Sequence, residues 1–476
     1  MYNREDEPLL SSLPPIGVRQ DQAYGSQSCS SPHPPTRTYW YRWYILGLFS
    51  LVGALENITW NTWGPIEASA RFTYGWSKGT VSLLADWGAI TFVLCVFPSA
   101  WLLDVKGLRI SVLLCTGCIA IGSVLRILSS EADVATPLIH MGQFVIGLGG
   151  PIGQSSATVI SSTWFPAHQR TLATAVASLA SYVGTAISFV IGPAFVTDVE
   201  TLKVNLINPS NNSHMVTRIS KEIMNLLILE FGIACLLFLL VLFTFPAKPK
   251  LPPSTTAALE RLDFNKGLKQ LLKNPQFQLI AFLYGITTGV YSAWCSDLAL
   301  NLSAYNIDND EASWFGFWAV VAGAMSGIIL SLIADWFGGF MKKILLCLFI
   351  FASIGFTIFS LMCVKVIPPT LPVLYLTSIV GGLCLNGAIP LFFELSVEAS
   401  YPVAEGINTG FMTFSNNVYC LIFLSLPMIP SVDTKWMNWT LVGSCVICIP
   451  MMLFFKERHR RLEVDVGTRN NTAHIN

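Results

Sequence analysis

Two carboxylates lie inside long apolar stretches of the sequence, where they could take up and release protons. Glu56 lies near the end of the first such stretch, and Asp86 lies within the second. Ionisable residues are costly to bury in a membrane segment, and those found there commonly mark proton pathways. We therefore expect Glu56 and Asp86 to couple proton movement to a change of conformation. For Glu56 the alternative is a structural role, as a group paired within the protein.

Amide and aromatic side chains next to Glu56 could bind a small organic molecule. Trp60 and Asn61 follow Asn57 by three and four positions, so the three residues share one side of a helix. A later stretch carries Tyr284 and Tyr291. Aromatic rings can stack on a flat ligand, and amides can hydrogen-bond its hydroxyl groups. Packing between helices is the alternative for each aromatic residue.

Two acid-centred turns repeat along the chain, and each closes a long apolar run. Residues 103–109 read LDVKGLR and residues 334–338 read ADWFG, so Asp335 follows Asp104 by 231 positions. Because both turns lie at helix ends rather than helix centres, we expect Asp104, Arg109 and Asp335 to belong to a gate. The repeated turn indicates a protein built from two related halves.

Two further acids are expected at the same gate. Glu394 and Glu398 are four positions apart, so they share one face of a helix near its end. We expect these carboxylates to hold the gate closed by pairing with Arg109 or Arg170.

The elements that carry these residues must be membrane helices. The residues AVILMFWYC make up 53% of the 476-residue chain and charged residues make up 12%, against roughly 25% charged residues in ordinary globular proteins. A helix needs roughly 20 apolar residues to cross a bilayer, so the length fits about twelve spans. We expect an all-α membrane protein with spans at residues 42–65, 79–103, 110–128, 138–162, 171–196, 223–245, 276–299, 314–336, 343–364, 370–395, 407–429 and 437–455.

Glycine positions also support a twofold repeat. Gly147 to Gly150 and Gly381 to Gly382 fall at corresponding places in the two halves. We expect two pseudo-symmetric six-helix bundles with a binding site between them at the bilayer midplane. The expected division is a disordered cytoplasmic tail at 1–40, a first bundle at 41–245, a cytoplasmic linker at 246–275, a second bundle at 276–456 and a cytoplasmic tail at 457–476.

The basic residues predict the orientation. If both termini are cytoplasmic, 20 of the 28 Lys and Arg residues lie on the cytoplasmic side, and the remaining 28 − 20 = 8 lie on the opposite side. Cytoplasmic loops carry the excess of Lys and Arg in membrane proteins. Both ends are therefore expected in the cytosol.

The expected N-terminal tail carries a candidate sorting signal. Glu5, Leu9 and Leu10 form an acidic dileucine pattern, the kind of motif that clathrin adaptors bind and that directs membrane proteins to lysosomes. A chance match is the alternative, because the motif is short.

Two asparagines are expected to carry glycans on the luminal side. Asn211 and Asn301 each begin an N-x-Ser pattern. Asn211 lies in a stretch expected to be a polar loop, residues 197–222.

Residue patterns for other chemistry are missing. All twelve cysteines except Cys29 fall in apolar stretches, and no second pair accompanies Cys115 and Cys118, so we expect no metal and no cofactor. The sequence contains no phosphate-binding loop and no nucleophile elbow, so an enzyme is not expected. The net charge of +0 gives no reason to expect nucleic-acid binding. We expect a monomer.

The repeated turn resembles the loop signature of the major facilitator superfamily. Asp104 and Arg109 match that signature, and the second copy keeps Asp335 and Gly338 without a nearby arginine. Residues 393–406, FELSVEASYPVAEG, resemble the branch that contains the heme and choline transporters related to the feline leukaemia virus subgroup C receptor. The resemblance implies a twelve-helix transporter that works by alternating access.

The same resemblance implies a set of cavity residues. Trp60 and Tyr284 would stack on a flat ring, and polar groups would hydrogen-bond its hydroxyls. The choline carriers have Gln and Trp where this chain has Glu56 and Asn57, and loss of that Trp weakens an aromatic cage for a cation. A polar ring is therefore favoured over choline. The matched positions are Asn57, Trp60, Tyr182, Tyr284 and Asn417.

Residues 60–66, WNTWGPI, resemble a lysosomal member of this branch that carries pyridoxine. The resemblance implies a lysosomal membrane protein that exports pyridoxine, a form of vitamin B6, together with protons. Two other classes stay open. One is a facilitator or exchanger for choline, heme or another organic solute, and the other is a membrane sensor that binds a metabolite without transporting it.

Overall fold

The structure is a computed structural model that describes residues 36–197, 209–258, 262–296, 298, 302, 309–337, 340–426 and 435–464. All regular secondary structure in these ranges is helical. The sorting residues Glu5, Leu9 and Leu10 and the acceptor Asn301 lie outside the described residues, so their roles stay predictions.

The first half of the chain folds into long helices that follow its apolar stretches. Local signals set several ends: the Ser77 hydroxyl accepts a hydrogen bond from the Thr80 backbone N–H at 3.1 Å, and Pro166 follows the end of α5. The long helices are α1 (Arg42–Trp60), α3 (Lys78–Lys106), α4 (Leu108–Ile127), α5 (Ala132–Trp164), α6 (Arg170–Phe195) and α7 (Pro209–Thr244), and the short ones are α2 (Glu67–Tyr74) and η2 (Ala167–Gln169).

The second half repeats this arrangement after two short linker helices. The linker helices are α8 (Thr255–Ala258) and α9 (Phe264–Lys273). The long helices are α10 (Pro275–Ser296), α12 (Asn309–Phe337), α13 (Met341–Cys363), α14 (Leu371–Ser400), α15 (Glu405–Ser425) and α16 (Trp436–Phe454).

Nine of the described helices are long and apolar enough to cross a membrane. Three more, α1, α5 and α15, are long enough to span a bilayer but less apolar. Polar residues inside membrane helices usually face a bundle interior or a cavity rather than lipid. The three less apolar helices are therefore the first places to look for a site.

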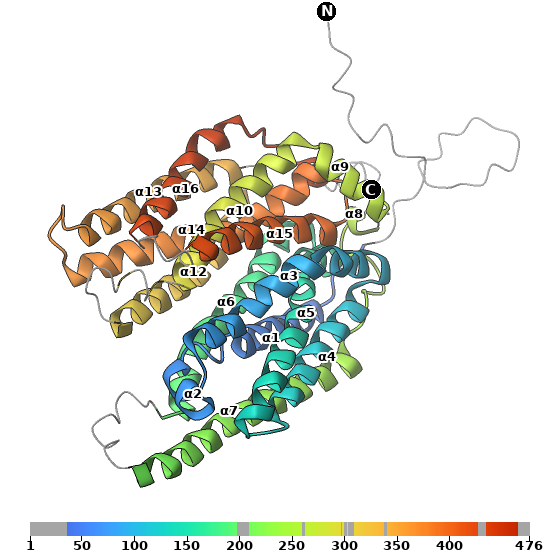
Figure 1. Ribbon diagram of the computed structural model, residues 1–476. Coiled ribbons are helices and arrows are strands. Elements are labelled where there is room, and N and C mark those ends of the chain that lie inside the picture. Colours follow the sequence, from blue (N-terminus) through green and yellow to red (C-terminus); the bar gives the residue numbers. More distant parts are fainter. Residues whose placement is uncertain are drawn as a thin grey trace, which may run out of the picture. The chain divides into compact units, whose positions relative to one another are not determined.

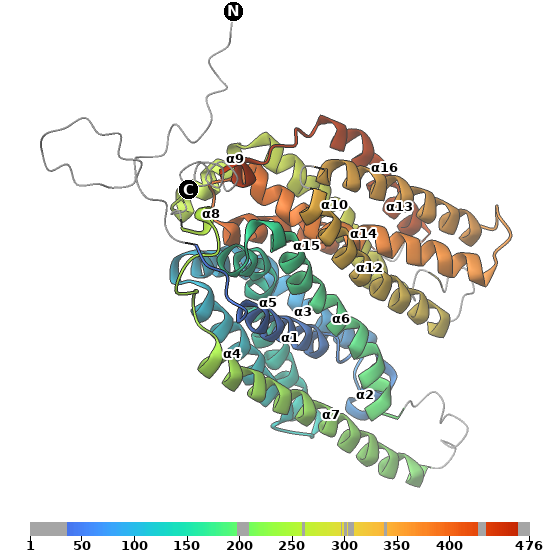
Figure 2. The same ribbon diagram turned by 180° about the vertical axis from the view of Figure 1, so that it is seen from behind.

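The two halves meet through a few helices. Helix α15 packs on α3 and α5, and helix α6 packs on α12 and α14. The linker helices α8 and α9 lie at the end of the molecule where these helices come together, which is the end expected to face the cytosol (Figure 1). The view from behind shows the same arrangement, with α2 and α7 diverging from α13 and α14 toward the opposite end (Figure 2).

The expected polar loop at residues 197–222 is wrong over its second part. Helix α7 begins at Pro209, well before the expected start of the span at 223. An ion pair between Arg218 and Glu222, 2.9 Å apart and one turn apart, supports this added length. Hydropathy alone misses a polar helical extension, because its charged side chains reduce the mean apolarity. Asn211 consequently lies in the first turn of α7.

The end of the first span also differs from the expectation. Helix α1 stops at Trp60 rather than at 65, and Asn61 caps it through its backbone N–H, which donates to the Asn57 carbonyl at 3.0 Å. Pro65 cannot supply a backbone N–H, and a turn leads from here into α2.

Candidate functional site

The two acid turns make matching contacts between the halves. Asp104, at the end of α3, accepts hydrogen bonds from the backbone N–H groups of Gly406 at 3.0 Å and Ile407 at 2.9 Å, in the first turn of α15. The first N–H groups of a helix have no intrahelical partner, and they form the positive end of the helix dipole. A carboxylate placed there binds the opposite half through charge and hydrogen bonds together.

Asp335 makes the equivalent contact in the other direction, from the second half to the first. Its two oxygens accept from the backbone N–H groups of Thr171 at 3.1 Å and Leu172 at 2.8 Å, in the first turn of α6. Each half therefore caps a helix of the other half, and the repeat that the sequence showed as two similar turns becomes a pair of equivalent contacts.

Close packing supports the Asp104 contact. A Cβ atom built on Gly406 would lie 2.3 Å from the Asp104 Oδ1 atom, so only glycine lets the carboxylate approach this helix end. A third bridge lies nearby, where the hydroxyls of Thr158 on α5 and Thr409 on α15 are 2.5 Å apart.

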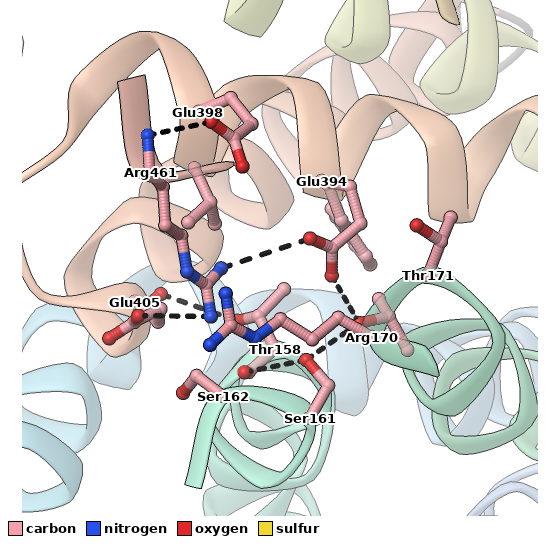
Figure 3. A network of polar contacts seen from close by, with 12 residues as sticks. Thr158, Ser161, Ser162, Arg170, Thr171, Glu394, Glu398, Glu405 and Arg461 are labelled. Carbon is pink, nitrogen blue, oxygen red and sulfur yellow. Dashed lines mark hydrogen bonds and ion pairs between the residues drawn. The ribbon is translucent and has the colours of Figure 1, made fainter. Parts of the chain in front are cut away.

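The acids of α14 lie in a buried polar network (Figure 3). Glu394 accepts a hydrogen bond from the Thr174 hydroxyl of α6 at 2.6 Å and lies 3.8 Å from the guanidinium of Arg461. Glu405, at the start of α15, lies 3.6 Å from the same guanidinium. Glu398 accepts from the Arg461 backbone N–H at 2.9 Å.

The expected pairing of Glu394 and Glu398 with Arg109 is wrong. Arg109 is exposed and donates to the Leu242 carbonyl of α7 at 3.1 Å. Arg170 donates to the Thr256 hydroxyl of the linker at 2.9 Å. Arg461 lies at ion-pair distance from Glu394 and Glu405. It follows the last apolar stretch, so no sequence pattern linked it to these acids.

Glu56 is 3% exposed and lies within the first half, between α1, α4 and α5. Its carboxylate rests against the α5 backbone: a Cβ on Gly153 would lie 2.5 Å from Oε2, and one on Gly150 would lie 3.0 Å from Oε1. No Lys, Arg or His in the described part of the chain forms an ion pair with it. Asp86 lies half-buried on α3.

The predicted ligands on α1 are already partly engaged. Asn57 donates to the Gly53 carbonyl at 3.1 Å and accepts from the Thr185 hydroxyl of α6 at 3.5 Å. The Asn61 amide donates to the Asn57 carbonyl at 2.9 Å. The ring of Trp60 lies directly against Gly88 of α3, and its buried Nε1 has no hydrogen-bond partner among the described residues.

The predicted ligands of the second half lie on α10 and α15. Tyr284 is buried, with its ring 5.3 Å from that of Phe393 on α14. Tyr291 stacks on Trp294 at 6.3 Å. The Asn417 amide donates to the Thr413 carbonyl of its own helix at 2.9 Å.

Tyr182 links the two sets. It lies on α6 of the first half and packs against the apolar core of the second half, which includes Tyr284 and Tyr291. Among the described ring contacts none joins Trp60 to Tyr284, since each ring packs within its own half. A ligand held between these two rings would therefore lie between the halves.

Sequence reasoning missed two polar residues of the second half. The Tyr291 hydroxyl lies close to the Asn386 amide of α14, yet neither the hydroxyl nor Asn386 Nδ2 completes a hydrogen bond with a described residue. Asn416, the neighbour of Asn417, donates to the Thr288 hydroxyl of α10 at 2.7 Å. Both asparagines lie inside apolar stretches, and that placement was the available signal.

A buried ion pair of the first half was also missed. Arg126 of α4 lies 3.0 Å from Glu230 of α7, and the Thr62 hydroxyl donates to Glu230 at 2.7 Å. The rule that selected Glu56, an ionisable residue in an apolar stretch, applies equally to these two residues. Their mutual pairing makes a structural role the simpler reading.

Comparison with known proteins identifies the family. Residues 45–423 match the Major Facilitator Superfamily. The chain is 38% identical to the solute carrier family 49 member 4 homolog of Xenopus laevis, over 91% of this chain and 95% of that protein. It is 26% identical to the human choline/ethanolamine transporter FLVCR2, over 90% of this chain and 80% of that protein.

Solved structures show the same fold. The E. coli fucose:proton symporter FucP superposes with a TM-score of 0.68 at 13% identity, over 87% of this chain and 99% of that chain. The predicted fold class and family resemblance are thus confirmed. The chain belongs to the major facilitator superfamily, within solute carrier family 49, and is a transporter rather than an enzyme.

Proposed function

We propose that this transporter exports pyridoxine from the lysosome together with protons, by alternating access. One observation carries the proposal. Glu56 is a buried acid with no ion pair among the residues that the structure describes. It directly precedes Asn57 on α1 and lies one helical turn before Trp60. Proton and substrate would then act on the same turn of one helix.

The burial of Glu56 supports proton coupling. An isolated charged carboxylate is far more costly to bury than a neutral acid. A conformational change that exposed Glu56 to water would remove this penalty and let the proton leave. Because Gly150 and Gly153 have no side chains, the Glu56 carboxylate packs directly against the backbone of α5 in this conformation.

Unpaired polar groups support a substrate that carries several hydroxyls. Trp60 Nε1, the Tyr291 hydroxyl and Asn386 Nδ2 are buried without a hydrogen-bond partner in the described part of the chain. Buried donors of this kind are normally satisfied. A pyridine ring bearing hydroxyl groups offers both a flat face for stacking and acceptors for these donors.

Choline remains the second candidate substrate. Relatives at 26% identity are named choline/ethanolamine transporters, and Tyr182, Tyr284 and Tyr291 provide aromatic rings for a cation. Asn57 stands where the choline carriers have Trp, which weakens such a cage. Heme or another organic solute, and a sensor that binds without transport, are the remaining alternatives.

A transport panel tests the proposal. Leu9→Ala combined with Leu10→Ala removes the dileucine pattern and should move the protein to the cell surface. The external medium then takes the place of the lysosomal lumen. Labelled pyridoxine should then enter faster at acidic than at neutral external pH, and excess unlabelled choline should not compete. Equal uptake at both pH values would contradict proton coupling. Uptake of choline in place of pyridoxine would contradict the substrate.

A further inference from the structure

The segment after the last membrane helix docks on the gate. The Lys456 backbone N–H donates to Gln276 of α10 at 2.8 Å. Lys342 of α13 donates through Nζ to the Phe455 carbonyl at 2.6 Å, and through its backbone N–H to Glu457 at 3.3 Å. These contacts fix the path of the chain as it leaves α16.

The docked segment ends in a helical turn that inserts an arginine into the protein. Arg461 is 1% exposed. The backbone N–H groups of Arg461 and Leu462 donate to one oxygen of Glu398 at 2.9 Å and 3.3 Å, so Glu398 caps this turn as Asp104 and Asp335 cap α15 and α6. The Arg461 side chain points between Glu394 and Glu405 (Figure 3).

Arg461 lies beside two of the contacts between the halves. Glu394 accepts from Thr174 of the first half, and Glu405 directly precedes Gly406, whose N–H binds Asp104. The positive charge of Arg461 stabilises the two acids while they are shielded from water. Without it, the closed gate would bury Glu394 after the loss of its ion pair, which is strongly unfavourable.

The way in which Arg461 is held suits a contact that must break. Its guanidinium lies at ion-pair distances of 3.6 and 3.8 Å, and none of its nitrogens completes a hydrogen bond with a described residue. A permanent buried ion pair normally has such hydrogen bonds to offset desolvation. Arg461 therefore combines full burial with incomplete bonding.

We infer that Arg461 is a latch, a positioning residue that holds the expected cytoplasmic gate closed through Glu394 and Glu405, and that the segment 456–464 must leave before the transporter opens at this end. The inference rests on alternating access and not on the identity of the substrate. It assigns to the segment after α16 a direct part in the transport cycle.

A distance measurement without substrate tests the latch. Spin labels replace two exposed residues, His168 of the first half and Lys343 of the second. The labels are introduced as unnatural amino acids, because the twelve cysteines of the chain would compete in cysteine labelling. In the purified full-length protein, Arg461→Gln should lower the ratio of short to long distances about tenfold. A buried carboxylate that lost its ion pair without access to water would cause a larger change, but water enters as the gate loosens.

The matched control is Arg458→Gln, which removes the same charge from an exposed position three residues earlier and should leave the distances unchanged. Adding Glu394→Gln to Arg461→Gln should restore part of the short-distance population, because the acid that has lost its ion pair is then uncharged. Identical distance distributions for Arg461→Gln and Arg458→Gln would overturn the latch.

A conservative variant covers loss of folding. If Arg461→Gln does not yield folded protein, Arg461→Lys keeps the charge but loses the planar fork, and a shift of about threefold toward the long distance is expected. An unchanged distribution in Arg461→Lys would then overturn the inference. Failure of the pyridoxine assay would leave these distances unaffected, so the two proposals can fail separately.

Discussion

The gate and the candidate substrate site differ in how completely their polar groups are paired. At the gate, both oxygens of Asp104 and both oxygens of Asp335 accept hydrogen bonds from the opposite half. At the site, Glu56 has no ion pair, and Trp60 Nε1 has no partner, within the described part of the chain. This difference indicates that contacts between the halves hold this conformation, and it supports the proposal that the site binds a ligand and a proton.

Removing a gate carboxylate should have the largest effect. Asp104→Ala deletes two hydrogen bonds from a charged acceptor to a helix end, each worth about 1.5–3 kcal/mol, and leaves the N–H groups of Gly406 and Ile407 without that partner. We expect at least a tenfold loss of transport and a shift toward the long His168–Lys343 distance. Asp335→Ala should do the same because its contact is equivalent. A normal transport rate in both variants would show that the caps do not hold the gate.

Removing a site aromatic should have a smaller effect, confined to the ligand. Trp60→Ala or Tyr284→Ala should weaken pyridoxine binding by about 1 to 3 kcal/mol, the range for losing a buried aromatic partner. Binding to purified protein and surface abundance are measured together, with Trp439→Ala on the exposed side of α16 as control. Lost abundance with unchanged affinity in the remaining protein would favour packing between helices.

Filling the space beside Glu56 tests the site more finely. A Cβ on Gly153 would lie 2.5 Å from Glu56 Oε2, so Gly153→Ala should displace the carboxylate and change transport at acidic pH about threefold, because contacts this close force a shift. Gly443→Ala is the matched control, since its Cβ meets no atom within 4 Å. An unaltered pH profile in Gly153→Ala would separate Glu56 from the pH response.

The smallest effect is expected for Asn211→Gln, which tests the orientation of the protein in the membrane. Asn211, in the first turn of α7, is expected to be luminal. Asn211→Gln should remove one glycan, seen as a faster gel band, and leave transport unchanged. An unshifted band in a glycosylating host would mean that the acceptor is unused or that the gate faces the lumen.

Much of the fold could be predicted from the sequence because its signals are local. Long apolar runs predicted the membrane helices, and the Asp104 and Asp335 turns predicted two related halves. The extension of α7 to Pro209 was not predicted, because its charged side chains lower the mean hydropathy of that segment. Its stabilising ion pair, Arg218 with Glu222, is visible only once a helix is assumed.

The site was harder to predict because its contacts join distant segments. Arg461 looked like one of several basic residues in a tail, and nothing local links it to Glu394 or Glu405. The position of Glu56 against Gly153 likewise depends on how α1 packs on α5. Residue types identified the acids correctly as unusual, but their partners follow from tertiary packing.

Glu56→Gln tests the central claim most directly. The amide mimics the protonated acid at nearly constant shape but cannot release a proton. Labelled pyridoxine transport, measured from acidic to neutral external pH in the surface-directed protein, should lose its acceleration by acid while pyridoxine binding persists. The control is Glu67→Gln, at a half-buried acid of α2 that pairs with Arg71, and it should retain the acceleration. Full pH dependence in Glu56→Gln would contradict the account.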